Sequence, residues 1–496
     1  MTTTEDARQE AQAGDPRRWK ALAVCLVAAF MSLLDVSIVN VALPSIRAGL
    51  EASESNLSWV LSGYALAFGL VLVPAGRLGD ARGRRNTFVV GLVLFTASSA
   101  VAGLAPDPNW LVAARLAQGI GGGFITPQTA GLIQQLFSAE ERGRAFGFLG
   151  TTIGLSTAVG PLAGGTIIKL FGAEEGWRGV FFVNVPIGIA AIVLAFRLIP
   201  ERKRSAEEKR RQDLDPVGVL LLGLAVFALL LPLVEERQWK GAAKWLLVPL
   251  AAVLFVAFVA WERRYGRRGR QPVVSLELFR LRSYSLGAGV ALLYFAGFTA
   301  IFFIFTLYLQ NGLGYSALTA GLAITPFAVG SAAGAALGGR VVTRLGRPLV
   351  AGGLVLVTLG FLGTIVAVAL EPGRSVGWAT LAPLLVAGIG SGFVISPNQA
   401  ITLSQVPVSG GGSAAGVLQT GQRVGSALGI AAVGAVFFGH VASSRGDWAG
   451  AFRTGLAVTT VFVVAALVLA ATDVLLGRTH DRERLHRRPE HRWSVH

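Results

Sequence analysis

Two ionisable residues interrupt apolar stretches of this chain, and both types of group can carry or control a proton. Asp35 lies within the apolar run 21–43, and Arg115 lies within the run 109–133. Counted from Trp19, Asp35 is about 16 residues into a helix, roughly 24 Å from its start. A charged Asp at the centre of a membrane span costs roughly 2.5 to 3.5 kcal/mol, so such residues usually face a partner or a cavity. We expect Asp35 to carry protons; the alternative is an acid that only ties its helix to a neighbour.

A second group of polar residues recurs at helical spacing in the run 412–438. Gln419, Gln422, Arg423 and Ser426 stand at positions i, i+3, i+4 and i+7, which places them on one stripe of a helix. Such a stripe lines a cavity or pairs with another helix. We favour a substrate cavity, and we expect six aromatic residues of the run 285–309 to face lipid rather than substrate. The candidate cavity residues are Asn40, Gln118, Gln419, Gln422 and Arg423, and the aromatic residues are Tyr294, Phe295, Phe298, Phe302, Phe303 and Phe305.

The sequence lacks the residues that several other kinds of functional site require. The single cysteine, Cys25, excludes a disulfide framework and a cysteine-based zinc site, and the C-terminal histidines do not have metal-ligand spacing. No Walker-type loop, GxSxG motif or catalytic carboxylate pair is present. Asp35 is the only carboxylate clearly inside a predicted span, since Glu262 and Asp473 lie near span ends. We therefore expect neither an enzyme nor a cofactor or metal site, and we look to a proton gradient for energy. The longest loops also leave no room for the output domain of a sensor.

The composition of the chain predicts transmembrane helices, and these helices must position the polar residues described above. Of 496 residues, 53% are hydrophobic and 15% are charged, against roughly 25% charged in soluble proteins. Because a bilayer core needs about 20 apolar residues per helical span, the chain has enough for many spans. The apolar runs predict fourteen transmembrane helices, near residues 21–43, 57–76, 87–105, 109–133, 144–169, 179–198, 216–234, 244–262, 285–309, 317–339, 348–370, 378–402, 412–438 and 454–476.

The positive charge follows the predicted spans. An even number of spans places both termini on one side, and 33 of the 44 Lys and Arg residues fall on that side. The positive-inside rule therefore makes both termini cytoplasmic. Arg outnumbers Lys by 38 to 6, which is typical of a GC-rich bacterial genome and predicts a bacterial inner membrane. Because the basic residues are spread over six loops and two tails, the net charge of +16 does not predict nucleic-acid binding.

Two echoes at nearly one offset indicate an internal repeat. The segment from Gly76 to Arg85 resembles the segment from Gly339 to Arg347, and residues 119–124 resemble residues 388–393. In the second copy of the first segment, Thr343 stands in the register of Asp80. Repeats of this kind are common in transporters. They predict two six-helix halves with a helix pair inserted between them, a 6 + 2 + 6 arrangement. We assign residues 1–18 to a cytoplasmic tail, 19–200 to the first half, 201–282 to the insertion, 283–476 to the second half and 477–496 to a disordered basic tail.

Five segments resemble the major facilitator superfamily, and within it the fourteen-span drug:proton antiporter subfamily. Residues 34–44, reading LDVSIVNVALP, resemble the first-helix signature of that subfamily, with Ser37 where Thr is usual. Residues 76–85 resemble the superfamily loop motif, and residues 115–119 resemble its fourth-helix motif. Residues 154–165 resemble the antiporter motif of the fifth helix, and residues 177–186 resemble the entry to the sixth. The resemblance covers residues 19–476 and implies an all-α integral membrane protein with the major facilitator fold.

The resemblance also implies roles for residues. Arg115 would assist proton movement by biasing a nearby acid, although it could instead be a static Arg that binds backbone carbonyls. In the loop motif, Asp80 would lie just before the next helix, where the helix N-terminus favours an anion. Together with Gly76, Gly83 and Arg84 it would latch the outward-open state through bonds to the other half, although the segment could instead be a merely solvated basic loop. The antiporter helix would seal the interface of the halves as a gate and would indicate export rather than import. Its gate residues would be Gly154, Gly160, Pro161, Gly164 and Gly165.

The sequence as a whole predicts a proton-coupled efflux transporter for hydrophobic or amphipathic drugs, acting as a monomer in the lipid bilayer. The alternative within transport is an exporter of an endogenous metabolite with the same fold. No carboxylate lies well inside the spans of the second half, so dedicated export of polycations is not expected.

The charge distribution makes a testable prediction about topology. A reporter that is active only in the periplasm should be active when fused after Arg237 and inactive when fused after Arg204. The loop around Arg204 holds many basic residues and should stay in the cytoplasm, whereas the loop around Arg237 holds few. The opposite pattern of activity would invert the predicted orientation.

Overall fold

The computed structural model describes residues 16–172, 174–201, 214–235, 239 and 241–486, and its regular structure is helical. Thirteen helical segments of this part are long and apolar enough to cross a membrane. Helix α5, with 29 residues, is the fourteenth long helix. The first group of helices comprises α2 (Arg18–Leu50), α3 (Glu54–Arg82), α4 (Arg84–Gly103), α5 (Pro108–Leu136), α6 (Ala139–Phe171), α7 (Gly176–Phe182) and α8 (Asn184–Leu198).

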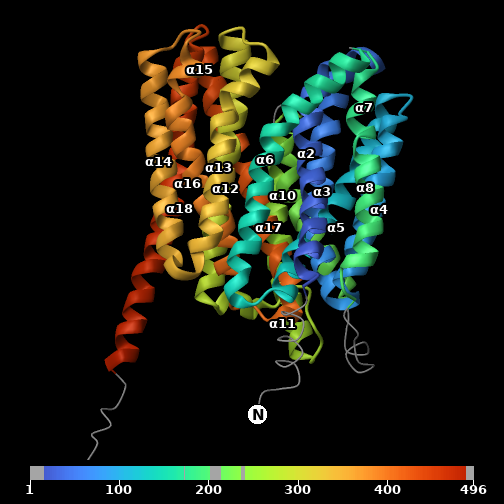
Figure 1. Ribbon diagram of the computed structural model, residues 1–496, viewed down its shortest axis with the longest axis vertical. Helices are drawn as coiled ribbons and strands as arrows, with labels where there is room; N and C mark the ends of the chain where they lie inside the picture. Colours follow the sequence, from blue (N-terminus) through green and yellow to red (C-terminus); the bar gives the residue numbers. More distant parts are fainter. Residues whose placement is uncertain (1–15, 173, 202–213, 236–238, 240, 487–496) are drawn as a thin grey trace, which may run out of the picture.

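Two further groups follow along the chain. The inserted pair is α10 (Pro216–Val234) and α11 (Leu247–Arg267). The second group comprises α12 (Arg282–Leu307), α13 (Ala317–Leu345), α14 (Arg347–Leu370), α15 (Val376–Ala379), α16 (Leu381–Thr402), α17 (Gly411–Ser443) and α18 (Trp448–His486). Figure 1 shows the first and second groups side by side, with the described ends of the chain at the same end of the bundle. We call this end the terminal side. The fourteen-helix fold predicted from the apolar runs is confirmed.

Local sequence signals explain where many helices begin. Ser53 and Asn56 form a reciprocal capping box at the start of α3, and Asp107 accepts hydrogen bonds from two backbone N–H groups at the start of α5. Gly83 adopts a φ of 111° between α3 and α4, a conformation that favours glycine. Most helices are several residues longer than the apolar runs predict, because the helices continue through polar residues outside the apolar core.

The last helix also continues through polar residues, and the prediction for the C-terminal tail is wrong in this respect. We expected a disordered tail from residue 477, but α18 continues to His486. Arg, Glu and Leu are good helix formers, so a helix already established in the apolar run continues through them. Residues 487–496, like residues 1–15 of the predicted N-terminal tail, lie outside the described part.

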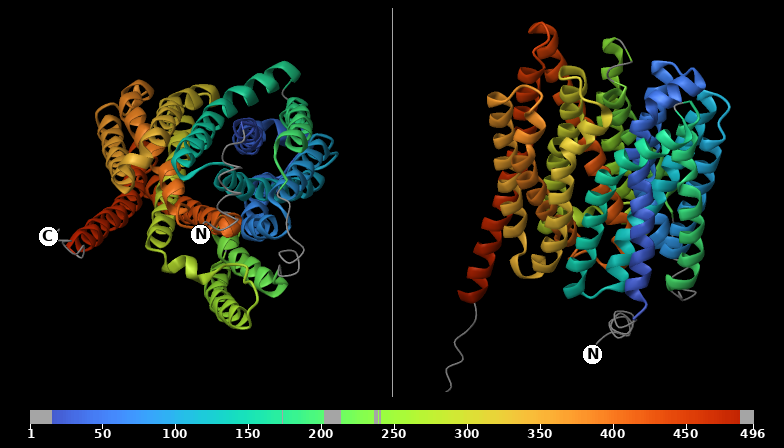
Figure 2. Two further views of the ribbon diagram at one scale, coloured as in Figure 1. Left: turned by 60° about the horizontal axis from the view of Figure 1, so that its bottom comes forward. Right: turned by 45° about the horizontal axis from the view of Figure 1, so that its top comes forward.

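The inserted pair lies against the seam between the two groups. Helix α10 contacts both α3 and α17, and Figure 2 shows the pair on one flank of the bundle. Ser62 of α3 donates a hydrogen bond of 2.8 Å to Glu235 at the end of α10. On the terminal side, Arg77 donates to the side chain of Gln271 at 3.0 Å. The pair is thus attached to the first group at both ends of α3.

Helix α6 lies between the two groups and owes its close packing to glycine. Gly147 faces Gly339 and Ala335 of α13, and Gly154 faces Ala328 and Ala332 of the same helix. A Cβ added at Gly154 would lie 2.9 Å from the backbone nitrogen of Ala332, which leaves no room for a side chain. Small residues at such spacing let helix backbones approach closely in membranes.

The predicted gate residues of α6 do not all face the other half. Gly154 faces α13, and Pro161 approaches Gly321 of α13. Gly160 and Gly164 instead pack on Ser37 and Ile38 of α2, within their own half. Gly165 has no neighbouring atom within 4 Å of where a Cβ would lie. The expectation that Gly160, Gly164 and Gly165 seal the interface of the halves is therefore wrong in this conformation. The glycines of α6 lie on different faces of the helix, so that Gly154 packs against α13 and Gly160 and Gly164 pack against α2.

This packing predicts the effect of bulk at the interface between the halves. Gly154→Leu should lower stability by about 1 to 3 kcal/mol through overpacking against α13. Gly352→Leu in α14 is the matched control, because nothing lies within 4 Å of a Cβ at Gly352. Thermal unfolding of the purified variants measures the difference. Equal melting temperatures for the two variants would show that the α6–α13 contact does not constrain the fold.

Candidate functional site

Asp35 lies at the centre of a fully buried hydrogen-bond network. Its Oδ2 accepts a bond of 2.5 Å from Nη1 of Arg115, and its Oδ1 accepts a bond of 2.9 Å from Nε2 of Gln118. Arg115 also donates to Oε1 of Gln118 at 2.7 Å and to the carbonyl of Val60 at 3.0 Å. The side chains of Asp35 and Arg115 are 0% and 1% exposed. The structure therefore joins three residues that the sequence singled out separately.

The network includes an amide that the sequence analysis did not assign to the site. Nδ2 of Asn184 donates to Oδ1 of Asp35 at 3.0 Å and lies 3.1 Å from Oγ of Ser99, and that hydroxyl donates to the carbonyl of Phe181 at 2.9 Å. Asn184 begins α8 and is fully buried. A polar side chain at the start of an apolar run was the available signal. Asp35 is thus bound by donors from α5 and α8, so its charge state affects several helices of the first half.

A row of aromatic rings leads from this network toward the second half. The guanidinium of Arg115 lies 4.3 Å from the ring centre of Tyr64, which stacks on Phe68 at 6.0 Å. On the far side, the guanidinium of Arg423 lies 4.5 Å from the ring centre of Phe68. Tyr64 is close enough to interact electrostatically with Asp35, Arg115 and Arg423. Two cations from opposite halves therefore lie on either end of one aromatic pair of α3.

The other candidate cavity residues separate into different environments. Gln118 belongs to the buried network, so its assignment to the cavity is wrong. Asn40 is exposed on α2 and donates to the carbonyl of Val36 at 3.0 Å. Gln419 is buried, whereas Gln422 and Arg423 are partly exposed.

The stripe on α17 thus combines the two alternatives that its spacing left open. Ser426 pairs with Thr299 of α12 through a hydrogen bond of 2.8 Å. Arg423 instead turns toward α3 of the other half. One end of the stripe therefore binds a neighbouring helix and the other end lies between the halves.

The aromatic residues of α12 also differ from expectation. Tyr294 and Phe305 are each 1% exposed, and none of the six predicted to face lipid is classed as exposed. Phe298 and Phe302 pack on Phe327 of α13 with ring centres 5.9 and 5.3 Å apart. The prediction of a lipid-facing aromatic surface is wrong, because these rings pack into the hydrophobic core formed by the helices of the second half.

Asp80 joins the halves on the terminal side. Its Oδ2 accepts bonds from the backbone nitrogen and the hydroxyl of Ser413 at 2.7 and 2.9 Å, and its Oδ1 accepts from the backbone nitrogen of Gly412 at 3.0 Å. These N–H groups belong to the first turn of α17, where the helix dipole favours an anion. The helix N-terminus that binds Asp80 is that of α17, not that of α4, which follows it in the chain. The bond joins the two halves, which is the kind of contact that the predicted latch requires.

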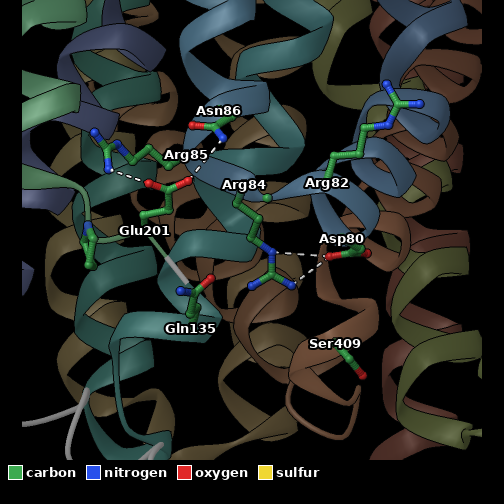
Figure 3. A pocket seen from close by; sticks show the side chains of 10 residues that line it. Asp80, Arg82, Arg84, Arg85, Asn86, Gln135, Glu201 and Ser409 are labelled. Carbon is green, nitrogen blue, oxygen red and sulfur yellow. Dashed lines mark hydrogen bonds and ion pairs between the residues drawn. The ribbon is translucent and has the colours of Figure 1, made fainter. Parts of the chain in front are cut away.

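Arg84 completes this contact. It pairs with Asp80 at 2.8 Å, donates to the carbonyl of Gly131 at 2.5 Å and also donates to the carbonyl of Val408 in the second half. Figure 3 shows the side chain of Arg84 directed at Asp80, with the loop that carries Ser409 below, beside a small open cleft. Gly76 meets Gly412 so closely that a Cβ there would overlap its carbonyl oxygen. The predicted loop-motif residues are therefore together at the interface, with Gly83 forming the turn.

The second copy of this motif does not join the halves in the same way. Arg347 occupies the register of Arg84, but its Nε lies 2.6 Å from Oδ2 of Asp473 in α18 of the same half. Arg282 also pairs with Asp473, at 3.1 Å. Asp473 and Glu262, which lie near span ends in the sequence, are both buried. The second copy of the motif therefore has Thr343 in the register of Asp80, and its arginine pairs instead with Asp473 of the same half.

The chain resembles known membrane transporters in sequence. A family profile described as Major Facilitator Superfamily matches residues 25–430 and, in a second match, residues 290–494. The chain is 42% identical over 455 residues to the probable actinorhodin transporter of Streptomyces coelicolor, covering 90% of this chain and 78% of that protein. It is 34% identical over 473 residues to the puromycin resistance protein pur8 of Streptomyces alboniger, covering 93% of this chain and 91% of that protein.

A solved structure supports the fold alone. The proton:xylose symporter XylE has a TM-score of 0.65 against this structure at 16% identity, covering 92% of this chain and 95% of that chain. The all-helical architecture and the long sequence matches agree, and they confirm the expectation of a transporter rather than an enzyme. This chain is a multi-pass membrane protein that belongs to the major facilitator superfamily.

Proposed function

We propose that this protein exports hydrophobic or amphipathic antibiotics and related small molecules from the cytoplasm in exchange for protons, as a member of the fourteen-span drug:proton antiporter subfamily. One observation carries the proposal for coupling, namely the fully buried Asp35 bound to Arg115, Gln118 and Asn184. Relatives named as an actinorhodin transporter and a puromycin resistance protein support export of antibiotics. The two halves in one chain supply both sides of the transport pathway, so we expect a monomer.

The chemistry of Asp35 suits reversible protonation. When ionised, its carboxylate is stabilised by the guanidinium of Arg115 and by two amide donors. Protonation would remove that charge and leave Arg115 without its counter-ion in a low-dielectric site, which costs several kcal/mol unless the helices rearrange. A proton can therefore change the relative stability of two arrangements of the first half.

The latch on the terminal side supplies the second part of the cycle. Asp80 and Arg84 hold α17 through bonds that must break before that side can open. If the terminal side is cytoplasmic, as the positive-inside rule predicts, this conformation is closed to the cytoplasm. Alternate opening would then follow from rocking of the halves about α6 and α13, the mode common to repeat-built transporters.

Proton coupling predicts the behaviour of Asp35→Asn. Uptake of an exported drug into inverted vesicles should require a proton gradient in the parent protein and should be abolished in the variant. The single variant leaves Arg115 as an unpaired buried cation, at a cost on the order of 3 to 5 kcal/mol. The double variant Asp35→Asn/Arg115→Gln removes both charges and should be more stable, yet equally inactive.

Glu277→Gln is the control, because it neutralises an exposed acid outside the network. Its transport should equal that of the parent protein. Transport that continues in the parent after a protonophore has collapsed the gradient would refute proton coupling, whatever the variants do.

The latch predicts a change in accessibility after Asp80→Asn. Ala415 of α17 is buried behind the Asp80 contact, so a cysteine at this position should react with a water-soluble thiol reagent only when the terminal side opens. With Cys25 replaced by Ser, the Asp80→Asn change should raise the labelling rate of Ala415→Cys by roughly ten-fold, since hydrogen bonds to a charged group contribute about 1.5 to 3 kcal/mol. An unchanged labelling rate in a folded variant would show that Asp80 does not hold this side closed.

A further inference from the structure

Arg423 has no counter-ion among the residues that the structure describes. Its guanidinium contacts the face of Phe68 at 4.5 Å, and no carboxylate lies within ion-pair distance of it. A guanidinium presents five N–H donors in its plane, whereas a cation–π contact uses its flat face. The donors at the edge of Arg423 therefore remain available while the side chain is held on Phe68.

Three other arginines inside the two halves each have an acidic partner, unlike Arg423. Arg115 is neutralised by Asp35, Arg84 by Asp80 and Arg347 by Asp473. Each of these three is also bonded to a carbonyl or an amide of the protein. An unpaired charge within a membrane span is costly and commonly marks a substrate or ion pathway. Arg423 differs from these three because no acid, carbonyl or amide of the described residues binds it.

No free acid is available to Arg423 in the described membrane spans of the second half, because the buried Asp473 of α18 is already paired with Arg282 and Arg347. The sequences of α12, α13, α14, α16 and α17 contain no Asp or Glu. In the first half, Asp35 lies beyond the Tyr64–Phe68 pair and already accepts three hydrogen bonds from other residues. Arg423 is therefore a positive charge between the halves that none of these acids neutralises.

We propose that Arg423 binds an anionic group of the transported molecule, and that the substrates of this protein are amphipathic organic anions carrying an ionised carboxylic acid or phenol. This inference rests on the proposed export function and specifies its substrate class. The guanidinium edge matches a carboxylate in a bidentate arrangement, which is stronger than a bond between neutral groups. Phe68 fixes the orientation of Arg423, and its partial exposure between the halves leaves access to a ligand.

Three fluorescent scaffolds test the proposal, namely a coumarin, a xanthene and a naphthalene, each prepared as a carboxylate, a methyl ester and a quaternary ammonium derivative. Export is measured as uptake into proton-loaded inverted vesicles, and binding is measured by fluorescence with purified protein in lipid nanodiscs. The parent protein should export and bind the carboxylates in preference to the esters and the cations. This comparison needs no variant and so does not depend on the folding of one.

Variants then assign the preference to Arg423. Arg423→Gln should weaken carboxylate binding by about ten- to a hundred-fold, as expected for loss of a charged hydrogen-bonding partner, and should leave ester binding unchanged. Arg423→Lys keeps the charge and should retain part of the preference. Arg263→Gln is the matched control, because Arg263 is exposed at the end of α11.

The outcomes separate this inference from the proposed function. Export of esters or cations in preference to carboxylates would overturn the anion assignment while leaving drug export intact. Equal loss of all three charge classes in Arg423→Gln would also overturn it, because the residue would then act on folding or gating. Absence of export for every compound, together with binding of the carboxylates alone, would support the anion site and refute the export function. Absence of both export and binding would refute both.

Discussion

The cost of a charge in a low-dielectric interior governs this structure, and the pair of Asp35 and Arg115 is where that cost is greatest. Neither side chain reaches water, so each depends on the other and on amides for its stability. The supporting donors come from α5 and α8, and the acid comes from α2. Loss or gain of one proton at this point therefore changes how three helices are held together.

The same constraint explains the contrast between the start of α17 and its middle. At its start, Asp80 from the other half satisfies backbone N–H groups that would otherwise lack partners. Further along, Arg423 meets only an aromatic ring of the other half. One helix thus carries a contact that closes the terminal side and a cation that remains available between the halves. Substrate binding and closure would then act on the same rigid element.

The sequence predicted the helices well because each apolar run encodes its own span. It also identified Asp35 and Arg115, since a charge is conspicuous in an apolar run, but it assigned Gln118 to a substrate cavity. It did not predict that Asn184 joins them, because that depends on the rotation of α8 about its axis. For the same reason, Gly160 and Gly164 were assigned to the wrong neighbour, and Asp80 was assigned to the helix next in the chain. Pairings between distant segments and rotations of helices are properties of the packed fold, and local spacing does not contain them.

The central claim is that Asp35 exchanges a proton when substrate binds. The most direct measurement is the release of protons from purified protein in weakly buffered solution when an exported drug is added, followed with a pH-sensitive dye. We expect proton release by the parent protein and by the Glu277→Gln variant, and none by Asp35→Asn/Arg115→Gln with the same drug at saturating concentration. Equal proton release from the double variant would contradict the account, because the exchanged proton would then belong to another group.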